Sequence, residues 1–287
     1  IHFKNLKPGA ETDTPIPNTE GQVTWANDNR TIFYSKKDSV TLRSNRIFKH
    51  KLGADPSKDQ LIFEETDETF YTGVYKTKYI IIWSGSTLTN YYQTVEANSP
   101  DGKFREFSPR ERGLEYSIDH YGDKFYVVTN LDAKNFKLME TTVTKTSKEN
   151  WREKIAHRND TLLQGIEIFK DYLVLSERAN ANSLMQIIDQ KTGAKHYLDF
   201  GEPAYTVFPS INLDFNTELL RYGYTSLTTP SSTFDYNMKT RERKLLKQQE
   251  IVGGYNPLDF QTERAWATAS DGTRVPLSIV YKKGIKK

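Results

Sequence analysis

Apolar residues recur along the chain in short runs, each of which ends in a small or hydroxyl-bearing residue. The first apolar residues of five such runs are separated by 47, 46, 47 and 47 residues; they are Ile32, Tyr79, Phe125, Tyr172 and Leu219. A register held through five copies indicates an internal repeat. Because each run is apolar at consecutive positions, it predicts a central strand that is buried on both faces.

Each central run is accompanied by more alternating segments, which predict further strands of the same sheet. In the first repeat a short strand at 22–25 leads into the run, a second strand follows at 46–52, and a third comes after a polar turn at 61–65. Four short antiparallel strands at a period in the forties predict the blades of a β-propeller. Residues 1–20 fit the outer two strands of an earlier blade, with a turn at 6–9. We therefore expect an all-β chain of about five four-stranded blades plus a partial blade, which begins part-way through a propeller.

The repeat stops after Gln249. Residues 250–259 contain two glycines and a proline and read as a linker. Two alternating segments then flank the dipeptide Asp271-Gly272, which predicts a β-hairpin with Pro276 on an edge strand. We expect a partial propeller domain at 1–249, followed at 250–287 by a linker and the start of a second domain.

Composition narrows the classes of partner. The chain has 40 basic and 37 acidic residues and a net charge of +3, which does not favour a nucleic-acid binder. It has no cysteine, so disulfides, thiolate metal sites and a cysteine nucleophile are excluded for this sequence. It has no apolar stretch of roughly 18 residues that would cross a membrane. We expect no nucleic-acid or membrane partner, no cofactor, and a cytoplasmic protein, although a bacterial periplasm would also tolerate this composition.

The sequence offers no recognisable catalytic constellation. The G-x-S-x-G pentapeptide of a serine nucleophile at a strand-to-helix turn is absent, and neither Ser84 nor Ser210 leads into a predicted helix. The histidines lack the spacing of metal ligands; they are His2, His50, His120, His157 and His196. We expect no catalytic and no metal-binding residue in this chain, and read His120 as a hydrogen-bonded residue of an inner strand.

One loop between blades carries the candidate binding residues, Arg110, Glu111 and Arg112. Such loops can face a neighbouring domain, so an inter-domain or substrate contact and an ordinary surface loop both remain open. The acidic pair Asp67-Glu68 could attract basic peptides, but a solvated turn is the favoured interpretation. The numerous tyrosines are typical of strand packing.

Several passages together resemble one branch of a known family. They lie at 23–28, 61–71, 114–121, 220–230 and 267–281, in order along the whole chain. The chain is similar to the oligopeptidase B branch of the prolyl oligopeptidase family of serine peptidases, also called protease II. The segments Thr225-Ser-Leu-Thr-Thr-Pro230 and Asp271-Gly-Thr-Arg-Val-Pro276 are common to the wider family, and the others point to this branch.

The resemblance implies a fold and an activity for a longer protein. Family members pair a seven-bladed propeller with an α/β-hydrolase domain whose Ser–Asp–His triad cleaves peptides, in this branch after Arg or Lys. It places the chain from within the second blade to the first hairpin of the hydrolase domain, and the triad downstream of Lys287. We then expect a propeller that gates access of peptide substrates, a hydrolase domain as partner, and an inactive isolated chain. The alternative is a non-catalytic propeller that serves as an interaction scaffold.

Overall fold

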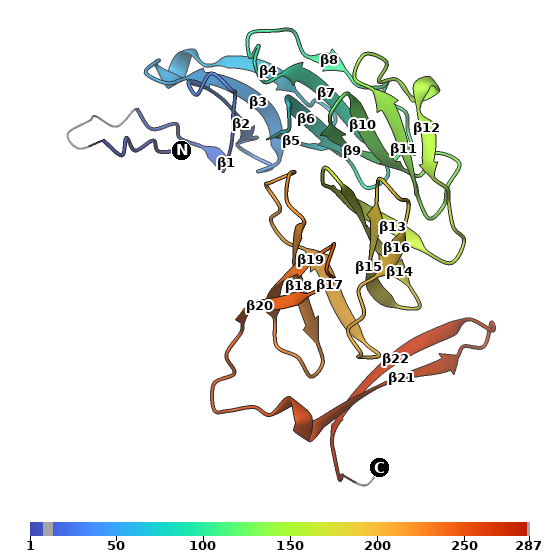
Figure 1. Ribbon diagram of the computed structural model, residues 1–287. Coiled ribbons are helices and arrows are strands. Elements are labelled where there is room, and N and C mark those ends of the chain that lie inside the picture. The colour runs from blue at the N-terminus through green and yellow to red at the C-terminus, as the bar shows by residue number, and fades with distance from the viewer. Residues whose placement is uncertain (8–13, 286–287) are drawn as a thin grey trace. The chain divides into compact units, whose positions relative to one another are not determined.

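The computed structural model describes residues 1–7 and 14–285. Within these residues the chain forms five four-stranded antiparallel sheets, each with its strands in sequence order, and one two-stranded sheet (Figure 1). The chain divides into two compact units, one of residues 1–131 and 138–155 and the other of residues 132–137 and 156–287. The five four-stranded sheets confirm the all-β blade architecture that the repeat predicts.

The first three sheets occupy the first unit. Their strands are β1 (Thr19–Trp25), β2 (Thr31–Lys37), β3 (Ser44–Lys51) and β4 (Gln60–Glu64); β5 (Tyr71–Lys76), β6 (Tyr79–Gly85), β7 (Asn90–Glu96) and β8 (Arg105–Glu106); β9 (Tyr116–Tyr121), β10 (Lys124–Thr129), β11 (Lys137–Thr142) and β12 (Arg152–Ile155). Short 3₁₀ turns precede β4 and β12, η1 (Pro56–Lys58) and η2 (Lys148–Asn150).

The other sheets occupy the second unit. Their strands are β13 (Leu162–Ile168), β14 (Tyr172–Ala179), β15 (Asn182–Asp189) and β16 (Lys195–Tyr197); β17 (Tyr205–Pro209), β18 (Leu219–Ser226), β19 (Ser232–Asn237) and β20 (Arg243–Gln248); β21 (Phe260–Thr268) and β22 (Arg274–Lys282). A 3₁₀ turn, η3 (Pro257–Asp259), leads into β21.

The five apolar runs form the second strand of each sheet, as predicted. In β2, β6, β10 and β14 consecutive residues are buried, for example Ile32, Phe33 and Tyr34 at 0% exposure. The fifth run departs from the prediction, because β18 alternates: Leu219 is 44% exposed while Leu220 is buried. One face of its sheet, with Phe208, Leu219 and Arg221, is open to solvent in the described part of the chain.

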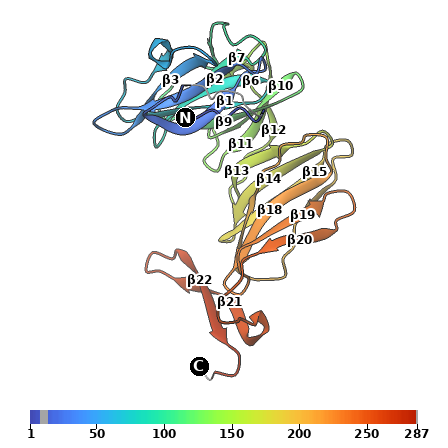
Figure 2. The ribbon, with the colours of Figure 1, turned by 90° about the vertical axis from the view of Figure 1, so that its left-hand side faces the viewer.

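Apolar side chains between neighbouring sheets make the cores. In the first unit, Ile81 and Tyr92 of the second sheet pack with Phe125 and Val127 of the third. In the second unit the fourth and fifth sheets lie side by side (Figure 2) and enclose a cluster that includes Val174, Ile187 and Tyr222. Burial of such side chains between sheets is the main stabilising term of this architecture.

The chain before β1 differs from the expected pair of outer strands. Ile1 and Ile16 exchange main-chain hydrogen bonds of 2.6 and 2.9 Å, but residues 1–7 and 14–18 contain no assigned strand. Pro15 and Pro17 flank Ile16 and have no N–H group, so the ladder cannot continue on either side of it. The predicted turn at 6–9 lies partly outside the described residues.

The predicted hairpin after the repeat is present as β21 and β22, which pair from Phe260–Lys282 to Thr268–Arg274. Gly272 adopts a φ of +84° in the connecting turn, a conformation that favours glycine. Pro276 lies opposite Trp266, and in the described residues its strand pairs with β21 only. The expected edge position of Pro276 is therefore confirmed.

Candidate functional site

The connections between strands place the candidate loop at one defined end of the sheets. In a four-stranded antiparallel meander, the loop from the fourth strand to the next sheet and the loop between the second and third strands emerge at the same end. Residues 107–115 join β8 to β9, residues 65–70 join β4 to β5, and residues 86–89 join β6 to β7. These three loops of the first unit meet at that end.

Arg110 is held firmly within this group of loops. Its guanidinium binds both carboxylate oxygens of Glu65, at 2.5 and 3.3 Å. The same guanidinium lies over the rings of Phe70 and Tyr91, 4.4 and 4.8 Å from their centroids. A bidentate pair with two aromatic contacts leaves this side chain little freedom.

Glu65 is a buried carboxylate at the centre of these contacts. It accepts hydrogen bonds from the hydroxyl of Ser84 and from the backbone N–H of Asp67 as well as from Arg110. Burial disfavours its charged form, but the bonds from Arg110, Ser84 and Asp67 outweigh burial and hold the pKa of Glu65 below its usual value. Glu65 therefore stays ionised and ties the loops together.

Arg43, in the turn that precedes β3, also binds the loop from β4 to β5. Its guanidinium is buried and donates to the carbonyl oxygens of Asp67, Phe70 and Glu65, at 2.9, 2.5 and 3.3 Å. The loop from β4 to β5 is thus fixed by two arginines, Arg43 and Arg110. Sequence reasoning did not identify Arg43 or Glu65, because their partners are distant along the chain.

The neighbours of Arg110 behave differently from it. Glu111 forms an ion pair with Lys148. Arg112 is exposed, and its side chain has no ion pair or hydrogen bond among the residues that the structure describes. The three predicted binding residues therefore comprise one arginine bound to a buried carboxylate, one surface pair and one guanidinium that faces solvent.

A pocket of about 620 Å³ opens between the three loops. The first loop contributes Asp67, Thr69 and Phe70, the second contributes Ser86, Thr87, Leu88 and Thr89, and the third contributes Arg110, Arg112 and Gly113. Asp67 accepts from the N–H and hydroxyl of Thr69, which hold the pKa of Asp67 below its usual value. The volume lies within the range of ligand pockets.

Three of the histidines and serines named above pack against or bind neighbouring side chains. His120 lies in β9 with its ring against Tyr79 and Phe125, and burial lowers the pKa of His120. His50 contacts Asp59 at 2.7 Å in the first sheet. Ser84 is buried and bound to Glu65. In the described residues, no group of three or more His, Cys, Asp or Glu side chains could hold a metal ion.

A second loop carboxylate, next to the fifth sheet, also binds hydroxyl groups. Glu202, in the loop from β16 to β17, accepts from the hydroxyls of Tyr224, Ser226, Thr228 and Thr229 at 2.6–2.8 Å. Burial raises its pKa, but these four hydroxyls outweigh burial and lower the pKa of Glu202 overall. This bonding gives a physical reason for the hydroxyl-rich segment Thr225-Ser-Leu-Thr-Thr-Pro230.

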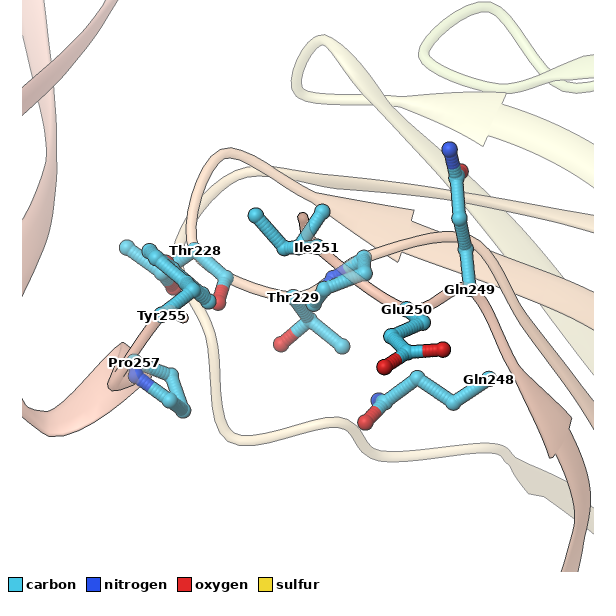
Figure 3. A pocket seen from close by; sticks show the side chains of 9 residues that line it. Thr228, Thr229, Gln248, Gln249, Glu250, Ile251, Tyr255 and Pro257 are labelled. Carbon is cyan, nitrogen blue, oxygen red and sulfur yellow. The ribbon is translucent and has the colours of Figure 1, made fainter. Parts of the chain in front are cut away.

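The linker after β20 lies against the same segment. The Tyr255 hydroxyl donates to the carbonyl of Thr228 at 2.8 Å. The two segments line a pocket of about 300 Å³; Figure 3 shows Thr228 beside Tyr255, with Pro257 nearby, and Thr229 near Ile251. Gln248 and Glu250 also line it. In the second unit, the carboxylate network therefore supports the loop on which the linker rests.

Comparison with known proteins identifies the chain's relatives. The family model described as "Prolyl oligopeptidase, N-terminal beta-propeller domain" matches residues 1–249. Dipeptidyl aminopeptidase BI of Pseudoxanthomonas mexicana is 41% identical over all of this chain, and Protease 2 of Moraxella lacunata is 31% identical over 99% of it. The chain spans only 40% and 41% of the lengths of these relatives.

Solved structures agree with the family match. Oligopeptidase B from Leishmania major superposes with a TM-score of 0.85 at 28% identity, over 94% of this chain and 39% of that one. Oligopeptidase B from Trypanosoma brucei, with covalently bound antipain, gives 0.85 at 27% identity over 94% and 40%. No helix in the described residues is long and apolar enough to span a membrane. The chain belongs to the prolyl oligopeptidase family of serine peptidases, and it covers the family's N-terminal β-propeller.

Proposed function

We propose that this chain is the propeller of an oligopeptidase B-like serine endopeptidase that cleaves short peptides after Arg or Lys. The observation that carries the proposal is the extent of the match. Nearly the whole chain aligns with Protease 2 of Moraxella lacunata and with oligopeptidase B of Leishmania major, of which it covers about two fifths. The catalytic triad then belongs to a hydrolase domain that begins within residues 250–287 and continues in the longer protein.

In this proposal the propeller acts by restricting access. A ring of blades over a catalytic face admits short, flexible peptides and rejects folded proteins, so selectivity arises from entry as well as from chemistry. The loops around Glu65 and around Glu202 are each tied by hydrogen bonds within their own unit, which supports this role because an ordered loop presents a defined surface to a substrate. A folded protein and a short peptide with the same Arg bond should therefore be cleaved at very different rates.

A second activity is favoured by one specific observation. The relative with 41% identity is named a dipeptidyl aminopeptidase, whereas Protease 2 has 31% identity. A dipeptidyl aminopeptidase requires a free amino terminus two residues before the cleaved bond, and an endopeptidase does not.

The two activities can be separated with reporter substrates. The coding sequence should be followed past Lys287 and the longer protein expressed. An arginine reporter with a blocked amino terminus and a dipeptidyl-arginine reporter with a free amine are then compared. Cleavage of the blocked reporter, abolished by a serine-directed inhibitor, is the expected result. Cleavage of the free-amine reporter alone favours the second activity, and a stop codon directly after Lys287 contradicts both.

The 287-residue chain by itself should not hydrolyse either reporter, because it lacks a G-x-S-x-G nucleophile segment. The measurement is reporter turnover as a function of chain concentration. Turnover that rises in proportion to the chain and is abolished by a serine-directed inhibitor would refute the expectation.

A further inference from the structure

We propose that the pocket between the three loops of the first unit binds a carboxylate group of a short peptide, with Arg112 as its charged ligand. The peptide nature of the ligand rests on the function proposed above. The pocket itself rests on its own geometry: about 620 Å³, open to solvent, and built on loops that Arg43 and Arg110 hold in place. Such a preorganised site loses little freedom when a ligand binds.

The charged groups around the pocket are paired to different degrees. Arg43 donates to backbone carbonyls of Glu65, Asp67 and Phe70, so no carboxylate in these bonds neutralises it. Glu65 neutralises Arg110. Asp67 is the carboxylate in the lining, and one of its oxygens is already bound by Thr69. Glu68 is exposed beside it and lies outside the lining.

Arg112 is the charged group of the lining that can reach a ligand. It lines the pocket, is exposed, and has no ion pair or hydrogen bond within the described ranges 1–7 and 14–285. A guanidinium can bind a carboxylate through two parallel N–H donors, and such a charge-assisted pair is stronger than a hydrogen bond between neutral groups. An anion with planar oxygens is therefore the ligand that this position fits.

The remaining lining suits the rest of a peptide. Leu88 is 61% exposed, so an apolar side chain next to the carboxylate would bury surface against it. Ser86 and Thr87 offer hydroxyl groups on the same loop. The carboxylate has two sources, the carboxyl terminus of a peptide or an Asp or Glu side chain.

Binding to the 287-residue chain tests the assignment without any catalysis. Fluorescence anisotropy would be measured with three peptides that carry a dye at the amino terminus: Ala-Ala-Phe with a free carboxyl terminus, the same peptide as an amide, and the amide of Ala-Glu-Phe. We expect the free acid to bind about tenfold more tightly than its amide, since one charge-assisted hydrogen-bonded pair is removed. Preferential binding of the third peptide would identify a side-chain carboxylate as the source.

Matched variants locate the binding. Arg112→Gln should abolish the preference for the acid, and Arg112→Lys should keep part of it because the charge remains. Arg105→Gln, an exposed arginine of β8 outside this pocket, should leave the preference unchanged. Circular dichroism confirms that each variant is folded. Equal binding of all three peptides, or an unchanged preference in Arg112→Gln, would overturn the site while leaving the proposed peptidase function untouched.

Discussion

At the scale of single residues, Glu65 shows how this fold keeps a buried charge. Its side chain is 4% exposed, and its carboxylate binds Arg110, the Ser84 hydroxyl and the Asp67 N–H. Taking a carboxylate out of water is costly unless such partners replace the lost hydration. The charged form of Glu65 therefore helps to hold the adjoining loops in place.

Replacing Arg110 by alanine should destabilise the chain, because Glu65 would lose its charged partner while remaining buried. We expect the free energy of unfolding to fall by about 2–3 kcal/mol, measured by urea denaturation. Arg112→Ala in the same loop is the matched control. Since Arg112 is exposed and without a partner in the described part of the chain, its removal should change stability by less than about 0.5 kcal/mol. Equal effects of the two substitutions would contradict this assignment.

The difference between wild type and Arg110→Ala should also depend on pH. The pKa of Glu65 is lowered in the folded state from 4.5. A lowered pKa contributes stability that is fully present above the unfolded value and is lost as pH falls through the folded value. The destabilisation by Arg110→Ala should therefore be full at pH 7 and shrink below pH 4.5. A difference that stays constant down to strongly acidic pH would show that charge is not its cause.

At the scale of elements, two aromatic rings lie across glycines of the neighbouring strand. A Cβ added to Gly73 in β5 would lie 2.6 Å from Nε1 of Trp83, its partner in β6. A Cβ added to Gly223 in β18 would lie 2.4 Å from the ring of Phe208 in β17. The pairs differ in their surroundings, because Trp83 packs against a core cluster and Phe208 is 47% exposed.

Gly73→Ala should therefore cost more than Gly223→Ala. Trp83 has to shift against its packed neighbours, which we expect to lower the free energy of unfolding by about 1–3 kcal/mol. Phe208 can turn into solvent, so Gly223→Ala should change stability by less than about 1 kcal/mol, partly offset by the smaller entropy of the unfolded chain. Urea denaturation followed by tryptophan fluorescence gives both values. The reverse order would show that Trp83 is the more adaptable ring.

At the scale of the whole molecule, the open face of the fifth sheet should promote self-association of this chain. Phe208 and Leu219 lie on that face at 47% and 44% exposure. Exposed apolar side chains on an uncovered sheet face favour contact with a second copy. Light scattering at increasing concentration should show oligomers, and Phe208→Glu combined with Leu219→Glu should reduce them. Val252→Glu, at a 99% exposed residue of the linker, is the control. A sharp monomer at high concentration would refute the prediction.

Much of the fold could be predicted because the repeat is local. A central strand must be apolar at consecutive positions, and this pattern is visible wherever it recurs, from Ile32 to Tyr172. The exception is the fifth run, where Arg221 interrupts the apolar positions and lies with Leu219 on the open face. The arginine marks this face in the sequence, whereas the exposure of Leu219 itself depends on whether another layer covers it.

The candidate site was predictable only as a loop. The sequence by itself determined the five sheets, the hairpin around Asp271-Gly272 and the position of Arg110, Glu111 and Arg112 between two blades. The tertiary structure alone decided that Arg110 binds Glu65, 45 residues earlier, and that Arg112 lines a pocket with Leu88. Periodicity is carried by neighbouring residues, whereas a pocket forms where loops distant along the chain meet, and that meeting depends on the packing of whole sheets.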